Sequence, residues 1–408
     1  MFSPRVIERA QEKLEAQLGI KLVRHSLATR QSFVDSLALS FDAKHRATRK
    51  LTREEHQFIT NEQLLCPIDY RYWATCYASI DWDPSYNEGS GIGPIVFNDP
   101  QELLLQSLAE REDLCYEQQA AGHTVYGIKV CCNKVRQIGF TAVFRTAGMH
   151  RLTLIPGTRA LSASVDPDKT VELYDRDQLL YKNLPSFLKP ATHYDVKAEQ
   201  WSFDFGTVDS RQLYQESTKR SGVGFGRQYD FLHLTEVPQW MNAKYDIELN
   251  ILPAIPRAVS TLAGIEAVPL GRGNWWHQFS EDCRLGLYPE WLYVYIPWYA
   301  LGKKYALTAP VNWHPEEDSL AHGQKVYETS PLYVGKTVLL SRDQLYWWEM
   351  ERKSARRSGT LSYFLTNYSA TPQESFQHFS QSAFPAELIE ELSNRASWSS
   401  SIPYELGV

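Results

Sequence analysis

Short continuous apolar runs, separated by segments of helical periodicity, dominate the hydrophobic pattern of the chain. Ile128 to Cys132 is such a run, and its length and its Val and Cys content predict a strand buried on both faces. A polar, basic turn follows, and the segment from Thr141 to about His150 is predicted to be helical. Further strands are expected at 159–165, 229–236, 259–266 and 292–298, with a helix over 168–183. Strands that alternate with helices indicate an α/β fold with a mostly parallel central sheet flanked by helices.

The flanking regions are predicted to be more helical. Residues 4–18 carry an amphipathic stripe, and a helical region is expected to about Ile80, before a turn-rich boundary from Asp81 to Gly93. Asp99 is expected to cap a helix that has Pro100 at its first position.

Two segments with period-two alternation, 201–206 and 212–217, predict a β-hairpin, and Ser341 is expected to cap a helix that runs to Arg357. The expected organisation is an N-terminal helical region over 1–90, a core over 91–300, a C-terminal lid-like part over 301–385 and a tail over 386–408.

Composition narrows the choice of partners. The chain has 408 residues, with 42 Lys and Arg against 48 Asp and Glu, so its net charge is −6 and any contact with nucleic acid must be a local patch. No apolar run is long enough to span a membrane. The six cysteines lack zinc-like spacing, which favours a reducing compartment and no structural metal.

The chemistry is expected at the turn between the first buried strand and its helix. A strand, a glycine-containing basic loop and a Thr-led helix form the layout of a phosphate-binding loop, in which backbone N–H groups hold the phosphates. The standard G-x-x-x-x-G-K-[ST] pattern is not met, since Phe140 stands where its lysine belongs. Lys134, seven residues before Thr141, and Arg136 can supply the cation from the front of the loop. An ordinary strand-to-helix turn with solvated cations remains the alternative.

The eight residues from Lys134 to Thr141 resemble the deviant Walker A loop of viral terminase large subunits, the ATPases that pump DNA into procapsids. The resemblance implies a P-loop NTPase (nucleoside triphosphatase) fold of the ASCE type, with ATP and Mg²⁺ as cofactors. It implies that ATP contacts Lys134, Arg136 and the segment Gln137, Gly139, Phe140 and Thr141. Thr141 would also reach the magnesium ion, and Arg136 the γ-phosphate.

Two further positions match the same family. Gln101 stands where similar ATPases hold the adenine edge with a glutamine, although an exposed helix glutamine is the alternative. Glu266, followed by Gly273, Asn274 and Trp275, resembles the terminase coupling motif, which implies that Glu266 contacts the nucleotide. Ala267 and Val268 lack the hydroxyls of that motif.

The strand that ends in Glu236 resembles a Walker B segment with Thr235 in place of its aspartate. This strand is expected to lie beside the strand of the phosphate loop. Glu236 would then orient or deprotonate the attacking water, and Thr235 would hold magnesium weakly or through water. The alternative is that Glu236 caps the next helix. His233 is expected to be a core histidine.

The resemblance, which covers roughly residues 95 to 385, implies ATP hydrolysis that drives packaging of double-stranded DNA in the host-cell cytoplasm. The implied partners are double-stranded DNA, a portal protein, a small terminase subunit and further copies of the chain in a ring, with no membrane. The basic run Arg352 to Arg357 is the best candidate for contact with DNA or a neighbouring subunit, and a solvated helix end is the alternative.

Two other functions remain open. The same core occurs in helicase-like ATPases that remodel nucleic acid, and a degenerate loop is compatible with a module that binds nucleotide without hydrolysis. The stretch after Phe376 is too short for the nuclease domain of full-length terminases, so no nuclease site is expected in this chain.

Overall fold

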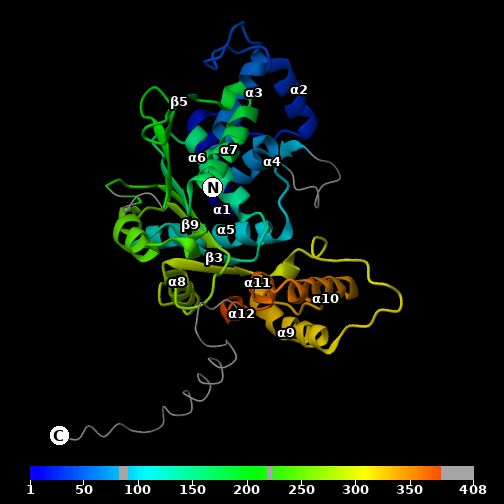
Figure 1. The fold of residues 1–408 in the computed structure, drawn as a ribbon. Coiled ribbons are helices and arrows are strands. Elements are labelled where there is room, and N and C mark those ends of the chain that lie inside the picture. The colour runs from blue at the N-terminus through cyan, green and yellow to red at the C-terminus, as the bar shows by residue number, and fades with distance from the viewer. Residues whose placement is uncertain (82–90, 218–222, 225, 378–408) are drawn as a thin grey trace, which may run out of the picture. The chain divides into compact units, whose positions relative to one another are not determined.

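The computed structural model describes residues 1–81, 91–217, 223–224 and 226–377, and the chain forms two compact units (Figure 1). Unit 1 comprises Met1–Ala267 and Phe279–Ile296, and unit 2 comprises Val268–Gln278 and Pro297–Val408. The expectations that fall partly or wholly outside the described residues include most of the turn-rich boundary, the end of the lid-like part over 301–385, and the tail over 386–408. The expected four-part organisation therefore stays a prediction.

Unit 1 is built on an eight-stranded sheet in the order β10-β3-β9-β8-β4-β7-β6-β5. The six strands from β10 to β7 are parallel, and β6 and β5 extend the sheet in antiparallel fashion. The strands are β3 Ile128–Lys134, β4 Arg159–Ser164, β5 Ala191–Asp195, β6 Gln200–Asp204, β7 Ser210–Glu216, β8 Phe231–Thr235, β9 Leu262–Ala267 and β10 Trp291–Ile296. The predicted mostly parallel sheet flanked by helices is confirmed.

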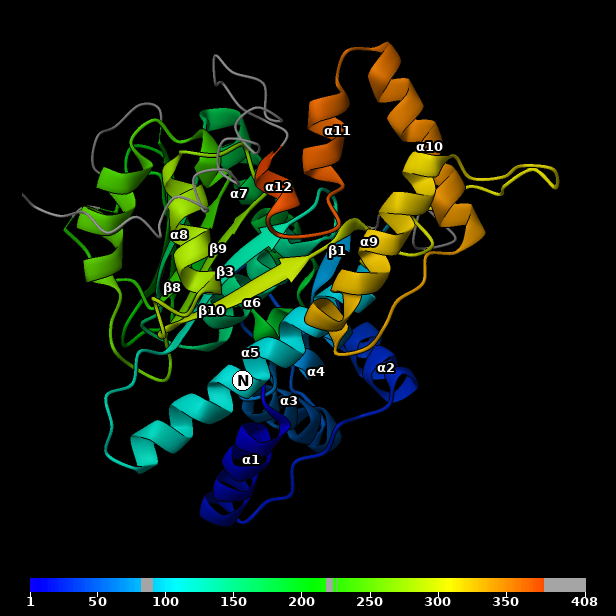
Figure 2. The same cartoon turned by 90° about the horizontal axis from the view of Figure 1, so that it is seen from below.

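One expectation about the strand order is wrong. Strand β8, which ends just before Glu236, does not lie beside β3, because β9 pairs with both strands and separates them. Figure 2 shows β10, β3, β9 and β8 side by side. Strands β8 and β9 are buried along their whole length, so apolar content alone did not decide which of them would neighbour β3.

The helices of unit 1 pack on this sheet and on one another. Helix α5, Asp99–Ala120, lies against β3 and β10, whereas α6, Phe140–Leu154, lies against β4, β8 and β9. Helix α7, Pro167–Asn183, covers β4 and β7. The N-terminal helices are α1 Pro4–Leu18, α2 Leu27–Leu37, α3 Arg53–Leu65 and α4 Tyr70–Tyr77, and the short strands β1 Ser79–Asp81 and β2 Ile92–Pro94 form a separate pair.

Close approach of α6 to the sheet depends on two glycines. A Cβ at Gly264 of β9 would lie 2.2 Å from the Phe144 ring, and a Cβ at Gly148 would lie 2.8 Å from the Phe231 ring. The Phe144 ring therefore rests directly on β9 and stacks on His233 of β8, with centroids 5.0 Å apart. This packing fixes the helix that follows the candidate phosphate loop.

The start of α5 differs from the prediction by one residue. Asn98, not Asp99, is the N-cap, and its side chain accepts a hydrogen bond from the backbone of Gln101. Gln101 returns the bond to the backbone of Asn98, which completes a capping box. Asn98 and Asp99 are both good capping residues, and the reciprocal Gln101 contact selects Asn98.

Unit 2 is mainly helical. Its helices include α9 Glu317–Val334, α10 Arg342–Arg357, α11 Leu361–Asn367 and α12 Glu374–Gln377, and the boundary helix α8 spans Trp275–Arg284. Ser341 caps α10 as predicted, and α10 ends at Arg357. The core is aromatic, with His322 stacked on Trp348 at 4.1 Å between centroids and on Trp298 at 5.8 Å. No helix within the described ranges is long and apolar enough to cross a membrane.

Candidate nucleotide-binding site

The candidate phosphate loop is a tight connection between β3 and α6. Strand β3 ends at Lys134 and α6 begins at Phe140, so that only 135–139 form the turn. Gln137 and Gly139 have φ of 57° and 80°, in the left-handed region. A Cβ at Gly139 would lie 2.5 Å from Gln101 Nε2, so glycine is needed there for both reasons.

Gln101 supports this loop from α5. Its Nε2 donates to the Gly139 carbonyl oxygen at 2.9 Å, and the neighbouring Asn98 Nδ2 donates to the Ile138 carbonyl oxygen at 3.4 Å. Gln101 is 4% exposed, so it is not the exposed surface glutamine of the alternative interpretation. Its expected contact with adenine stays a prediction.

A fully buried carboxylate joins the two ends of the loop. Thr141 Oγ1 donates to Glu266 Oε1 at 2.5 Å, and Lys134 Nζ lies 3.0 Å from Glu266 Oε2. Lys134 comes from the end of β3, Thr141 from the first turn of α6, and Glu266 from β9 between β3 and β8. Burial raises the pKa of Glu266, but Lys134, His233 and Thr141 outweigh this effect and lower it to about 2. The carboxylate is therefore charged at neutral pH.

Behind Glu266 lies a buried polar network. His233 Nε2 is 3.2 Å from Glu266 Oε1, and its Nδ1 is 3.3 Å from Arg145 Nη1. Arg145 of α6 also donates to Ser162 and, with two nitrogens, to Asp177 of α7. All of these side chains are at most 1% exposed. Burial lowers the pKa of His233 despite the nearby Glu266, so His233 is neutral.

The sequence analysis did not predict this network. Arg145 falls in a helix among apolar residues, and His233 interrupts an apolar strand. Buried charges and imidazoles need partners, so each position signalled an unidentified contact. The partner residues lie 32 and 88 positions from Arg145, too far apart for any local pattern to pair them.

The other predicted site residues divide into exposed and buried sets. Arg136 and Gln137 are exposed on the turn, and Phe140 is fully buried. Thr235 is 9% exposed at the end of β8. Glu236 is partly exposed, has a left-handed φ of 58°, and accepts a hydrogen bond from Gln239 Nε2. The catalytic and magnesium roles expected of these residues stay predictions.

The side-chain oxygens at the loop fit a magnesium ion that is bound together with a nucleotide. Across the described ranges, no group of three or more His, Cys, Asp or Glu side chains forms a protein-only metal site. Thr141 and Glu266 offer a hydroxyl and a carboxylate in contact. Magnesium prefers oxygen ligands and takes most of them from phosphates and water in nucleotide sites, so two protein oxygens are adequate.

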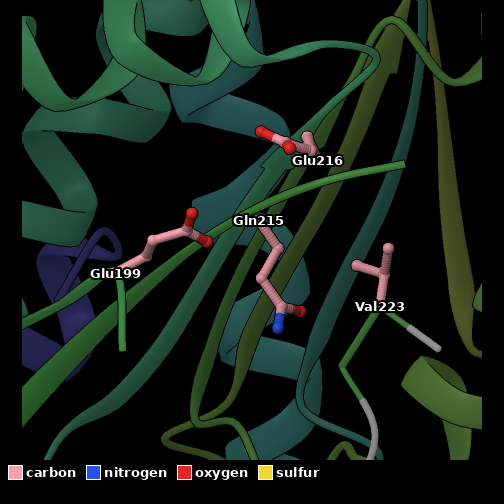
Figure 3. Close-up of a pocket in the computed structure, with 4 residues that line it drawn as sticks. All are labelled: Glu199, Gln215, Glu216 and Val223. Carbon is pink, nitrogen blue, oxygen red and sulfur yellow. The ribbon is translucent and has the colours of Figure 1, made fainter. Parts of the chain in front are cut away.

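A small pocket lies elsewhere on the same sheet. It is lined by Glu199, Gln215, Glu216 and Val223, and Figure 3 shows the Gln215 side chain between Glu199 and Val223. Gln215 Oε1 accepts from the backbone of Gly224 at 2.7 Å and so ties Gly224 to β7. Strands β9, β8 and β4 lie between β7 and β3. The pocket is therefore separate from the phosphate loop.

The candidate DNA-binding run in unit 2 is partly neutralised. Arg352 pairs with Asp318, Lys353 pairs with Glu316 at 2.6 Å and with Glu349 at 2.8 Å, and Arg356 lies 3.9 Å from Asp318. The expected DNA contact of the run stays a prediction.

Asn274, expected in the coupling motif, donates to the Leu270 carbonyl oxygen at 2.6 Å.

The strand order and the loop define the class of fold. The loop-bearing strand β3 lies between β10 and β9, and β9 is the additional strand that separates β3 from β8. A parallel sheet in this order, with a glycine turn leading from β3 into a helix, is the P-loop NTPase fold of the additional-strand (ASCE) class expected above.

Comparison with known proteins finds similarity at the level of the fold. No protein-family model matches the chain. No curated protein matches it in sequence. Among solved structures it is similar to the Thermus phage P74-26 large terminase ATPase domain, with 15% identity and a TM-score of 0.35 over 53% of this chain and 87% of that one.

The bacteriophage HK97 large terminase is similar with 10% identity and a TM-score of 0.43, over 65% of this chain and 49% of that one. A large terminase from a thermophilic bacteriophage, in complex with ATP-γ-S, has 8% identity and a TM-score of 0.29, over 53% of this chain and 49% of that one. All three are phage large terminases, the family whose motifs the sequence resembles. No residue role is carried over from them.

Proposed function

We propose that the chain binds ATP with magnesium at the Lys134–Thr141 loop and hydrolyses it. One observation carries the proposal: a cation and a hydroxyl, supplied from opposite ends of a glycine turn, meet on one buried carboxylate at the carboxyl end of a parallel sheet. Cation, hydroxyl and carboxylate are the three side-chain types that a phosphate loop needs around nucleotide phosphates and magnesium.

The proposed roles follow from the chemistry of each group. Lys134 exchanges its contact with Glu266 for the β- and γ-phosphates, which are stronger acceptors than a carboxylate already shared with Thr141 and His233. The backbone N–H groups at the start of α6 add to phosphate binding. Thr141 would hold the magnesium ion, which would neutralise charge that develops on the phosphates.

Arg136, on the turn, is the proposed contact of the γ-phosphate, and Glu236, after β8, the proposed general base. Gln101 would combine its support of Gly139 with a contact to adenine, so that base recognition and loop geometry depend on one side chain. These roles rest on the motif positions together with the geometry around Glu266.

We further propose that hydrolysis drives translocation of double-stranded DNA during packaging, in a ring of subunits on a portal protein and together with a small terminase subunit. The order of the motifs along the chain supports this: the adenine glutamine, the phosphate loop, the acidic strand and the coupling segment follow one another as in terminases. The partly paired run from Arg352 to Arg357 is the proposed contact of unit 2 with DNA or a neighbouring subunit.

The test is magnesium-dependent ATP turnover by the purified chain, with and without double-stranded DNA, beside Lys134→Ala. Turnover that DNA stimulates and that the variant lacks supports the proposal. Strand separation of a fluorescent duplex would instead favour the helicase-like alternative. ATP binding without turnover under every condition would favour the binding module, and turnover that Lys134→Ala leaves unchanged would remove the loop assignment.

A further inference from the structure

We propose that Glu266 is the carboxylate that faces the nucleotide-bound magnesium in this site, and that Arg145 and His233 are positioning residues that hold it there. This inference rests on the proposed binding of ATP. It adds a magnesium role to Glu266, for which the motif resemblance implies only nucleotide contact, and it assigns roles to two buried residues that the motifs leave without one.

Strand β8 ends without the aspartate of a standard Walker B strand. In P-loop NTPases the loop Ser or Thr and an aspartate at the end of the Walker B strand hold magnesium, and Thr235 occupies that aspartate position here. Glu266 is the register partner of Thr235 on the adjacent parallel strand, so both side chains emerge on the same face of the sheet. Glu266 is also in register with Cys132 of β3. The carboxylate is thus supplied by β9, which is adjacent to the loop-bearing strand β3, and not by β8.

Contacts made by its two oxygens agree with this role. Oε1 accepts from Thr141 Oγ1, the hydroxyl on the magnesium side of the loop. Oε2 is buried and accepts no hydrogen bond from the residues that the structure describes, although Lys134 Nζ lies at ion-pair distance. Once Lys134 turns to the phosphates, the buried carboxylate needs another positive charge. Magnesium beside Thr141 supplies that charge.

The orientation of His233 is set by Arg145. A guanidinium only donates hydrogen bonds, so His233 Nδ1, at 3.3 Å, must present its lone pair to Arg145. The imidazole proton is then on Nε2, which donates to Glu266 Oε1. Arg145 in turn is held by Asp177, whose Oδ2 also accepts from Tyr214 Oη at 2.6 Å.

The ring itself cannot rotate easily. Phe144 stacks on it at an interplanar angle of 20°, and Phe144 reaches this place because Gly264 has no side chain. Arg145 lies one helical turn after Thr141 on α6, so the loop hydroxyl and the support of its acceptor are carried by the same helix. The network thus fixes both partners of the Thr141–Glu266 contact.

The first test measures how much magnesium strengthens ATP binding, as the ratio of the dissociation constants of a fluorescent ATP in EDTA and in excess Mg²⁺. Glu266→Gln removes the charge and keeps the shape, so the ratio is expected to fall about 10- to 100-fold, the effect typical of losing a group that orients a metal site. Affinity in EDTA is expected not to fall. Glu8→Gln, which removes the charge of an exposed acid on α1, is the matched control and is expected to keep the wild-type ratio.

The second test addresses positioning. His233→Gln places an N–H donor near the position of Nε2 and is expected to keep most of the magnesium effect, whereas His233→Leu is expected to lose about tenfold or more. In the Glu266→Gln background, His233→Leu is expected to change the ratio no further, because His233 acts through Glu266. A purely structural His233 would give equal and additive losses in both backgrounds.

A third measurement is independent of nucleotide and of the stability of the Leu variant. The imidazole ¹⁵N shifts of His233 in the wild-type chain are expected to report the Nε2–H tautomer, and Arg145→Lys, which loses the fixed donor to Nδ1, is expected to weaken that preference. An Nδ1–H tautomer in the wild type would overturn the positioning role.

The two proposals fail differently. A wild type that binds ATP with a magnesium effect which Glu266→Gln retains would overturn this inference and leave the proposed function standing. A wild type that binds no ATP in either condition would overturn both.

Discussion

Both units of the chain contain buried histidines, and His233 of unit 1 and His322 of unit 2 are buried in different ways. In unit 1, His233 lies between a guanidinium and a carboxylate, in a chain of polar contacts from Asp177 to Lys134. In unit 2, His322 is stacked on Trp348 and accepts a hydrogen bond from Trp298 Nε1 at 3.2 Å. Burial lowers the pKa of both.

These different surroundings distinguish a candidate site in unit 1 from a structural core in unit 2. Aromatic packing of the kind around His322 stabilises a fold by burying apolar area, and Trp298 gives the ring one neutral hydrogen bond. Buried charge networks stabilise weakly, because desolvation offsets most of their Coulomb energy. The network of unit 1 ends at a glycine turn with a cation, where charge would serve the proposed binding of phosphates. Substitutions should therefore affect chemistry in unit 1 and stability in unit 2.

The largest expected effect is that of Lys134→Ala. It removes the proposed phosphate cation, and ATP turnover is expected to fall to background, on the order of a thousandfold or more. Lys336→Ala, an exposed lysine of unit 2, is the matched control and should keep wild-type turnover. Steady-state phosphate release measures both, and thermal melting verifies the fold. Equal activity of the two variants would contradict the assignment.

The second largest effect is expected of Glu236→Gln, which keeps the shape and hydrogen bonding of the side chain but removes its basicity. A general base contributes roughly a hundred- to ten-thousandfold, so kcat is expected to fall by about that much. ATP affinity should change little, because a base acts mainly in the transition state. If kcat survives and Glu266→Gln abolishes it, the base must be sought on β9.

The pH dependence of folding stability tests the burial of His322 in unit 2. The pKa of His322 is lowered to about 4 by burial, against about 6.5 in an unfolded chain. The unfolded state therefore takes up the proton first, and stability is lost as pH falls from about 6.5 to about 4, by about 3 kcal/mol in all. His322→Phe keeps a ring but cannot titrate.

The measured quantity is the difference in unfolding free energy between wild type and His322→Phe across that pH window. It is expected to change in favour of the variant as pH falls and to be flat above about pH 7. A difference that does not depend on pH would mean that the wild-type imidazole is solvated or already charged when folded.

The smallest effects are expected at Gly335 and Gly139, two glycines whose φ lies in the left-handed region. Gly335, at the end of α9, has φ of 68° and open space around its Cβ position, so Gly335→Ala should cost about 1 kcal/mol of stability. Gly139→Ala adds a clash with Gln101 to the same strain and should cost about 1–3 kcal/mol more. It should also weaken ATP binding, which Gly335→Ala should not. Chemical unfolding and nucleotide titration measure the pair.

The sequence predicted the sheet well, because fully buried parallel strands are read directly from apolar runs. The runs around Ile128, Leu161 and Leu232 all became strands, and the helix predicted over 168–183 is α7. Strand β5 was not predicted, since its residues are mostly exposed and lack alternation. The order of β9 and β8 could not be predicted, because both strands are buried along their whole length and neighbours in a sheet are chosen by long-range packing.

The candidate site was predicted as separate motifs, and its connections were not. Lys134, Thr141 and Glu266 were identified individually, but their meeting depends on β9 lying next to β3. Arg145 and Asp177 carry no local signal that identifies them as partners, since they lie 32 residues apart on different helices. Only the tertiary fold makes them partners of His233.

The location of Lys134 on a strand has a mechanical consequence. In the standard motif the lysine and the hydroxyl residue are adjacent in sequence, so both move with the helix. Here Lys134 is in register with Ile296 of β10 and is anchored in the sheet, whereas Thr141 belongs to α6. The distance between the backbones of Lys134 and Thr141 thus changes when α6 moves against the sheet. A force that slides α6 by a fraction of an ångström would change the span available to a triphosphate, and occupancy of that span would resist the slide.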